Sequence, residues 1–160
     1  MAILHLMCGL PCSGKTTLAK RLERQHAALR LTPDEWHTRL FGQDVDHPDH
    51  DARHNLVEAI MWEVAARVLE LGTNVILDFG LWAKEERDEF RSRATVLGAS
   101  SELHFLDVSE EELLKRLAAR NAHLPDKTFA IPEAKLKAWI QMFQTPTKEE
   151  LESHFSDSSL

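Results

Sequence analysis

The residues with the clearest chemical meaning lie near the start of the chain. The pattern G-x-x-x-x-G-K-[ST] is matched by Gly9, Leu10, Pro11, Cys12, Ser13, Gly14, Lys15 and Thr16, and Thr17 follows. Glycines in such a loop let backbone N–H groups surround phosphate groups, while the lysine reaches the β- and γ-phosphates of a nucleotide and the threonine hydroxyl ligates Mg²⁺. We therefore predict that residues 9–17 bind Mg·ATP, with Lys15 catalytic and Thr16 on the metal.

Two carboxylates follow apolar segments that have the composition of buried strands. Asp78 comes directly after the run at 74–77, and Asp107 follows the run at 102–106. A carboxylate at the end of a strand beside a phosphate-binding loop can hold Mg²⁺ directly or through water. A hydrogen-bonding role at the strand end is the alternative for both. We predict a metal-binding role for Asp78 alone.

Apolar runs and helical periodicities alternate along the chain, and this alternation specifies how such residues are positioned. Strands are expected at 2–8, 28–31, 74–77 and 102–106; helices at 15–25, from 33, and at 52–71, 84–97, 110–121, 133–143 and after Thr147. Such alternation predicts an α/β protein with three layers, α/β/α, of the P-loop NTPase type. Its central sheet should be mostly parallel, with four to five strands, and ligands should gather at their carboxyl ends.

Helix starts are marked by capping residues. Thr32 with Glu35, and Ser109 with Glu112, fit the capping-box spacing, in which the hydroxyl and the carboxylate each accept a backbone hydrogen bond. Thr147 is expected to cap a short terminal helix. The first of these boxes places Asp34 at a helix N-terminus.

The segment G-L-P-C-S-G-K-T-T resembles that of small P-loop kinases related to polynucleotide kinase, chloramphenicol phosphotransferase and the zeta-toxin kinases, a group of bacterial AAA-type ATP-binding kinases. In that group the second strand ends in an aspartate about twenty residues after the loop lysine, and here Asp34 falls nineteen residues after Lys15. The resemblance implies that Asp34 is the base that accepts the hydrogen of an incoming hydroxyl, which is reasonable for a carboxylate across from the γ-phosphate. The alternative is that Asp34 only stabilises a helix N-terminus.

Arg116 and Arg120 lie one helical turn apart, just before a loop at 123–132. Phosphoryl transfer needs positive charge over the transferred group, and a lid that spans about 120–132 could supply it. In the resembling kinases such arginines contact the nucleotide, which implies that Arg120 binds the γ-phosphate and Arg116 the nucleotide. A solvated helix face is the alternative.

The acceptor side is less clearly marked. Trp36, Arg39 and Trp82 follow strand ends, where a substrate cavity would open, and we predict that they contact the substrate. For Arg39 this rests on the resemblance, because the related kinases carry a basic residue shortly after the aspartate. Histidines and aspartates at 46–54 match no zinc-site spacing and are expected to form a solvated loop.

Composition limits the classes of protein and partner. The 160 residues suit a single domain, 1–160, with a mobile tail at 153–160. The net charge is -7; residues 1–40 carry six Lys/Arg against three Asp/Glu, and the remainder thirteen against twenty-three, which argues against a long nucleic-acid partner. Two cysteines form no disulfide framework or zinc motif, no segment resembles a membrane span or a leader, and no protein partner is indicated. A cytoplasmic protein is expected.

These features predict a kinase that moves the γ-phosphate of Mg·ATP to a hydroxyl of a small molecule. Three alternatives remain open. The acceptor could be a polynucleotide 5′-hydroxyl or, as in the zeta-toxin kinases, a nucleotide sugar. A regulatory ATPase that transfers phosphate to water is the third alternative.

Overall fold

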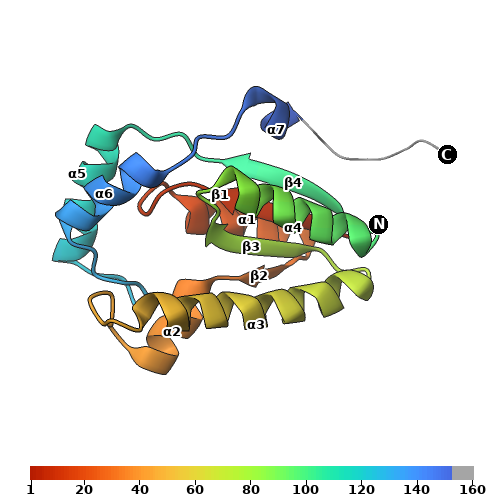
Figure 1. Ribbon diagram of the computed structural model, residues 1–160, viewed down its shortest axis with the longest axis horizontal. Helices are drawn as coiled ribbons and strands as arrows, with labels where there is room; N and C mark the ends of the chain where they lie inside the picture. Colours follow the sequence, from red (N-terminus) through yellow and green to blue (C-terminus); the bar gives the residue numbers. More distant parts are fainter. Residues whose placement is uncertain (153–160) are drawn as a thin grey trace.

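The computed structural model describes residues 1–152, and a parallel sheet lies at its centre (Figure 1). Within these residues the strands are β1 (Ile3–Cys8), β2 (Leu29–Leu31), β3 (Val75–Gly80) and β4 (Ser100–Phe105). Their order across the sheet is β2-β3-β1-β4, and every neighbouring pair is parallel. The carboxyl ends of all four strands therefore meet at one edge, where a ligand site is expected.

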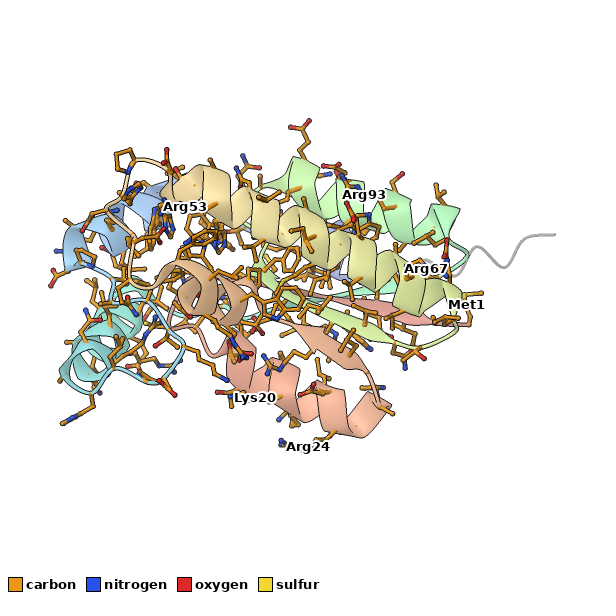
Figure 2. The ribbon with its side chains drawn as sticks, turned by 90° about the horizontal axis from the view of Figure 1, so that it is seen from below. Met1, Lys20, Arg24, Arg53, Arg67 and Arg93 are labelled. Carbon is orange, nitrogen blue, oxygen red and sulfur yellow. The ribbon has the colours of Figure 1, made fainter. Side chains whose placement is uncertain are left out.

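Helices cover both faces of the sheet. The two views place α1 on one face and α3 with α4 on the other; Lys20 and Arg24 project from the α1 layer, and Arg53, Arg67 and Arg93 from the opposite layer (Figures 1 and 2). The described helices are α1 (Lys15–His26), α2 (Pro33–Phe41), α3 (His50–Glu70), α4 (Lys84–Val96), α5 (Glu110–Ala122), α6 (Glu133–Met142) and α7 (Lys148–Glu152). The predicted three-layer α/β fold is confirmed.

Burial on both faces explains the apolar runs in the strands. On β1, Leu4 and Leu6 pack against α3 and α4, whereas Met7 packs against Ala19 and Leu22 of α1. Successive side chains of a strand point to opposite faces, so a strand covered on both sides needs apolar residues at consecutive positions. On β3 the same alternation directs Asp78 toward the α1 side.

A separate apolar cluster joins α5 and α6 to the start of the phosphate loop. Leu113 and Leu117 of α5 pack with Leu136 of α6, and Leu10 belongs to the same cluster. Phe129, in the loop between the two helices, is also buried there. The predicted lid segment is thus anchored beside the phosphate loop, while its movement stays a prediction.

The strand ends and helix caps differ from the expectations at three points. β3 continues to Gly80, so Asp78 lies within the strand rather than after it. Thr32 precedes α2, but the predicted capping box is wrong, because its hydroxyl donates to Asp78 and no side-chain cap bond forms. The box at Ser109 forms only in part, since the carboxylate of Glu112 pairs with Arg116.

Thr147 caps the start of the short helix α7, as expected. Thr147 Oγ1 accepts a hydrogen bond from the Glu150 backbone at 3.3 Å, and the Glu150 carboxylate accepts one from the Thr147 backbone at 2.8 Å. The predicted mobile tail at 153–160 lies outside the described residues. Within the described residues, no helix is both long and apolar enough to cross a membrane.

Candidate active site

The phosphate loop crosses from the end of β1 to the start of α1. The Gly9 backbone N–H donates to Gly80 O at 2.9 Å, and the Lys15 Nζ donates to Leu10 O at 3.0 Å. A Cβ placed on Gly9 would lie 2.7 Å from Ser13 Oγ, and Gly14 has φ 96°, a conformation that favours glycine. Both glycines of the motif are therefore required by the shape of the loop.

Three side chains converge beneath the loop in a geometry that suits a divalent cation. Thr16 Oγ1 donates to Asp78 Oδ2 at 2.7 Å, and Thr32 Oγ1 donates to the same oxygen at 3.2 Å. The other oxygen, Asp78 Oδ1, is buried and accepts no hydrogen bond from residues 1–152. Because Thr16 donates to Asp78, its oxygen lone pairs stay available, so Thr16 and Asp78 fit Mg²⁺, directly or through water.

Lys15 lies in a mixed electrostatic environment. Burial lowers its pKa, while the carboxylates of Asp78 and Asp34 act in the opposite direction and favour the charged form. The ammonium group donates a hydrogen bond to Leu10 O, within the same phosphate loop. A phosphate group would bring the negative charge that stabilises the protonated lysine.

The two predicted arginines reach the phosphate loop from α5. Arg116 Nη1 donates to Cys12 O at 3.3 Å. Arg120 Nη1 lies 3.5 Å from Cys12 Sγ, its Nη2 donates to Phe129 O at 2.7 Å, and its buried Nε has no hydrogen-bond partner within residues 1–152. Both guanidinium groups thus contact the loop, and Arg120 also lines the cleft beside it.

Two cavities meet at Asp34. The first, about 380 Å³, is lined by the phosphate loop, Asp78 and residues 125–128 of the predicted lid. The second, about 640 Å³, opens between α3, α4 and α6, and both volumes lie near the range typical of ligand sites. The two share Pro11, Asp34, Phe79 and Trp82. Asp34 therefore stands between a space that suits a nucleotide and a space that suits an acceptor.

The predicted acceptor residues divide into two groups. Trp82 lines both cavities. Trp36 is 38% exposed and Arg39 is also exposed, and neither lines either cavity. The structure does not bring these two side chains of α2 to the site, and their contact with substrate stays a prediction.

The histidine- and aspartate-rich segment is only in part the solvated loop that the sequence suggested, because residues 46–49 are exposed whereas His50 and His54 belong to α3. Asp44 is buried, and its Oδ1 accepts from His37 Nε2 and His50 Nδ1, both at 2.7 Å, while its Oδ2 accepts from Arg53 at 3.0 Å. His54 Nδ1 lies 3.3 Å from His37 Nδ1. These bonds hold the 42–49 connection against α2 and α3. The expectation failed for His50 and His54 because it considered residues 46–54 without His37 and Asp44, their buried partners.

Arg87 and Glu150 were not found by sequence reasoning, although they shape the wall of the second cavity. Arg87 is fully buried, donates to both carboxylate oxygens of Glu150, and donates to the backbone oxygens of Leu81, Trp82 and Gln144. Those three residues line the second cavity. No local pattern links an arginine in α4 to a glutamate in α7.

Comparisons with known proteins agree with this arrangement. The sequence model of a family described as "AAA domain" (AAA_33) matches residues 4–146. No curated protein matches the chain.

Several solved structures have a similar fold. A putative kinase from Chloroflexus aurantiacus superposes with a TM-score of 0.71 at 19% identity, over 85% of this chain and 73% of that chain. A gluconokinase from Sinorhizobium meliloti gives 0.65 at 19% identity, over 92% and 77%. A chain of the Pnkp1/Rnl/Hen1 RNA repair complex gives 0.68 at 25% identity, over 88% of this chain but only 43% of that chain.

Proposed function

The chain belongs to the AAA domain family and shares its fold with solved kinases, and we propose that it transfers the γ-phosphate of Mg·ATP to a hydroxyl group of a small molecule. The observation that carries the proposal is the position of Asp34, whose side chain lines both the cleft beside the phosphate loop and the adjoining cavity. A carboxylate at this junction can accept the proton of an acceptor hydroxyl and align its oxygen.

Separate residues take the proton, stabilise the transferred group and bind the nucleotide. The acceptor oxygen attacks the γ-phosphorus, the bond between that phosphorus and the β,γ-bridging oxygen breaks, and ADP leaves. Asp34 takes the hydroxyl proton. Lys15 and Arg120 stabilise the negative charge on the transferred group, and Arg116 binds the nucleotide.

Thr16 and Asp78 would hold Mg²⁺, which when bound neutralises charge on the β- and γ-phosphates. Thr32 supports this assignment, because its hydrogen bond fixes the orientation of the Asp78 carboxylate. The buried Asp78 Oδ1, without a partner among residues 1–152, leaves an acceptor for the metal or one of its waters.

A polynucleotide 5′-hydroxyl kinase is the second candidate, favoured by the likeness to the RNA repair complex. The lining of the acceptor cavity weighs against it. Among the described residues, no lysine or arginine lines that cavity, so it offers no permanently charged cation to a phosphate backbone. Phosphorylation of a 5′-hydroxyl oligonucleotide in preference to small alcohols would favour this candidate.

The test of the proposed base is Asp34→Asn. We expect nucleotide affinity to stay within about threefold of the original chain, while acceptor phosphorylation falls by about two orders of magnitude or more, the range for loss of a general base. Asp107→Asn is the matched control, because Asp107 follows β4 but lines neither cavity at Asp34. Unchanged turnover in Asp34→Asn would assign that residue a structural role.

A cytoplasmic location is part of the proposal. Cys8 and Cys12 are both free, and Cys12 lies in the phosphate loop. Reduced thiols suit a compartment that keeps ATP and thiols together.

A further inference from the structure

The acceptor cavity has an unbalanced charge. Four carboxylates line it, from Asp34, Asp51, Glu58 and Glu86. Within residues 1–152, no lysine or arginine lines it. The neighbouring nucleotide cleft is different, because four lysine or arginine side chains, Lys15, Lys20, Arg120 and Lys127, accompany the four carboxylates that line it, Asp34, Glu35, Asp78 and Asp126. The acceptor cavity therefore lacks the fixed cations that offset the carboxylates of the cleft.

Glu58 on α3 and Glu86 on α4 face the cavity from two helices of one layer. Burial raises the pKa of Glu86, and the charge of Glu58 adds to the shift. Glu86 has no lysine or arginine within 4.0 Å in the described part of the chain, and the guanidinium of the next residue, Arg87, is engaged with Glu150. Among residues 1–152, Glu86 thus has no ion-pair partner of its own, and the charge of Arg87 and a backbone hydrogen bond at Ala83 offset the rise in its pKa only in part.

Glu58 is only partly compensated. His54 Nε2 lies 3.4 Å from Glu58 Oε1. Burial lowers the pKa of His54, but the hydrogen bond and charge of Glu58, together with the charges of Asp34 and Asp51, outweigh burial and raise that pKa above the usual value. Two histidines, His50 and His54, line the cavity, and together they could offset only two of the four carboxylates, so the cavity keeps a net negative charge.

Aromatic side chains line the same cavity as these carboxylates. The rings of Trp82 and Trp139 lie 5.5 Å apart between centroids at an angle of 49°, and Phe129 lines the same cavity. Indole faces attract ammonium groups, so a cation between indoles and carboxylates would gain from both. A phosphate or carboxylate group would instead meet repulsion from the four acids.

We propose that the acceptor is a cationic hydroxylated small molecule, an amino alcohol or amino sugar, with its ammonium group at Glu58 and Glu86 and its hydroxyl at Asp34. This inference rests on the proposed function and names its substrate class. The hydroxyl oxygen forms the new bond to the γ-phosphorus, ADP leaves, and the proton passes to Asp34, while the ammonium group takes no part in bond making. The cavity of about 640 Å³ is large enough for a substituted sugar.

Matched pairs of ligands test the charge directly. Binding of D-glucosamine against D-glucose, and of choline against its neutral carbon analogue 3,3-dimethyl-1-butanol, can be measured by calorimetry with a non-hydrolysable ATP analogue and Mg²⁺ present. We expect at least one cation to bind about tenfold or more tightly than its neutral partner, since a charged hydrogen bond or ion pair in such a site is worth that ratio. If no cation exceeds its partner by tenfold, the inference is wrong.

The variant Glu86→Gln locates the effect. We expect it to weaken binding of the cation by about fivefold or more and to leave the neutral partner unchanged. Glu85→Gln is the matched control, because Glu85 is the preceding residue of α4, is exposed, and does not line the cavity. Equal losses in the two variants would overturn the assignment to Glu86.

Turnover separates this inference from the proposed function. Phosphorylation of neutral alcohols and of their amine-bearing counterparts at equal rates would refute the amine preference while the kinase proposal stands. Selective binding of the cation together with release of inorganic phosphate alone would support the cavity assignment and refute the kinase proposal.

Discussion

Replacing Arg87 by methionine should destabilise the protein strongly. Arg87 is fully buried and Glu150 is 5% exposed, and the guanidinium makes two hydrogen bonds to Glu150, at 2.8 and 3.3 Å. It also donates to the backbone oxygens of Leu81, Trp82 and Gln144 at 2.9 to 3.2 Å. The variant would leave a buried carboxylate without its guanidinium and three carbonyls without that donor. Breaking such a pair costs about 3 to 5 kcal/mol, a large part of the stability of a typical domain.

Urea unfolding followed by circular dichroism measures this cost. The double variant Arg87→Met/Glu150→Met, which removes both charges, should be more stable than Arg87→Met by about 2 kcal/mol or more, because it also removes the buried carboxylate that loses its guanidinium in Arg87→Met. A loss below about 1 kcal/mol in Arg87→Met, or a double variant as unstable as the sum of the single variants, would refute the reasoning.

Where Arg87→Met remains folded, its kinetics should also show which site it supports. Arg87 holds the backbone of Trp82 and Gln144 on the wall of the acceptor cavity, and its hydrogen bonds within residues 1–152 go to Leu81, Trp82, Gln144 and Glu150 rather than to residues 9–17. We expect the KM for the acceptor to rise at least about fivefold while nucleotide affinity stays within about twofold. An equal loss for both ligands would indicate general unfolding instead.

Two further predictions concern the loop and the core. Gly9→Ala should lower ATP affinity, measured by nucleotide titration, at least about tenfold, because the new Cβ would lie 2.7 Å from Ser13 Oγ. Adding Ser13→Ala should restore part of that affinity. An unchanged affinity in Gly9→Ala would contradict the loop geometry. Burial, with His104 adding to it, lowers the pKa of His5 to about 4, so the unfolded chain takes up the proton first as pH falls. The unfolding free energy should therefore drop by about 2 kcal/mol between pH 7 and 5 from His5 alone. His5→Leu should remove that part of the pH dependence of the unfolding free energy. An equal pH dependence in the two chains would refute this reasoning.

The parts of the site that a local pattern specifies were predictable from the sequence. The phosphate loop needs glycines, a lysine and a threonine at fixed spacing, and a strand must precede it, so Gly9 to Thr16 could be placed without a structure. Asp78 could be found in the same way, because an apolar run leads directly to it. The layers of the fold followed from alternating strand and helix patterns.

The remaining parts depend on contacts between residues far apart in the chain. Thr32 was predicted as a helix cap, but the fold places it beside Asp78, 46 residues away, and that carboxylate is the better acceptor for its hydroxyl. Arg87 and Glu150 are 63 residues apart and meet only because α7 returns to α4. Glu58 and Glu86 look like ordinary surface acids on amphipathic helices until the cavity between those helices is seen.

The acceptor side illustrates a second limit of sequence reasoning. Trp36 and Arg39 follow the second strand closely, which suggested a place at its end, but on α2 their side chains are exposed and line neither cavity. Proximity in sequence does not specify which face of a helix a residue occupies. The face depends on the packing of α2 against α3, which no short motif encodes.

The central claim is phosphoryl transfer to an acceptor, and its most direct test follows the γ-phosphate itself. ATP labelled at that phosphate would be incubated with the protein, Mg²⁺ and a panel of amino sugars, amino alcohols, neutral sugars and 5′-hydroxyl oligonucleotides, with Lys15→Ala as control. The account predicts that label moves to an amine-bearing alcohol and that Lys15→Ala abolishes the transfer. Release of the label only as inorganic phosphate, at a rate that no acceptor changes, would contradict it.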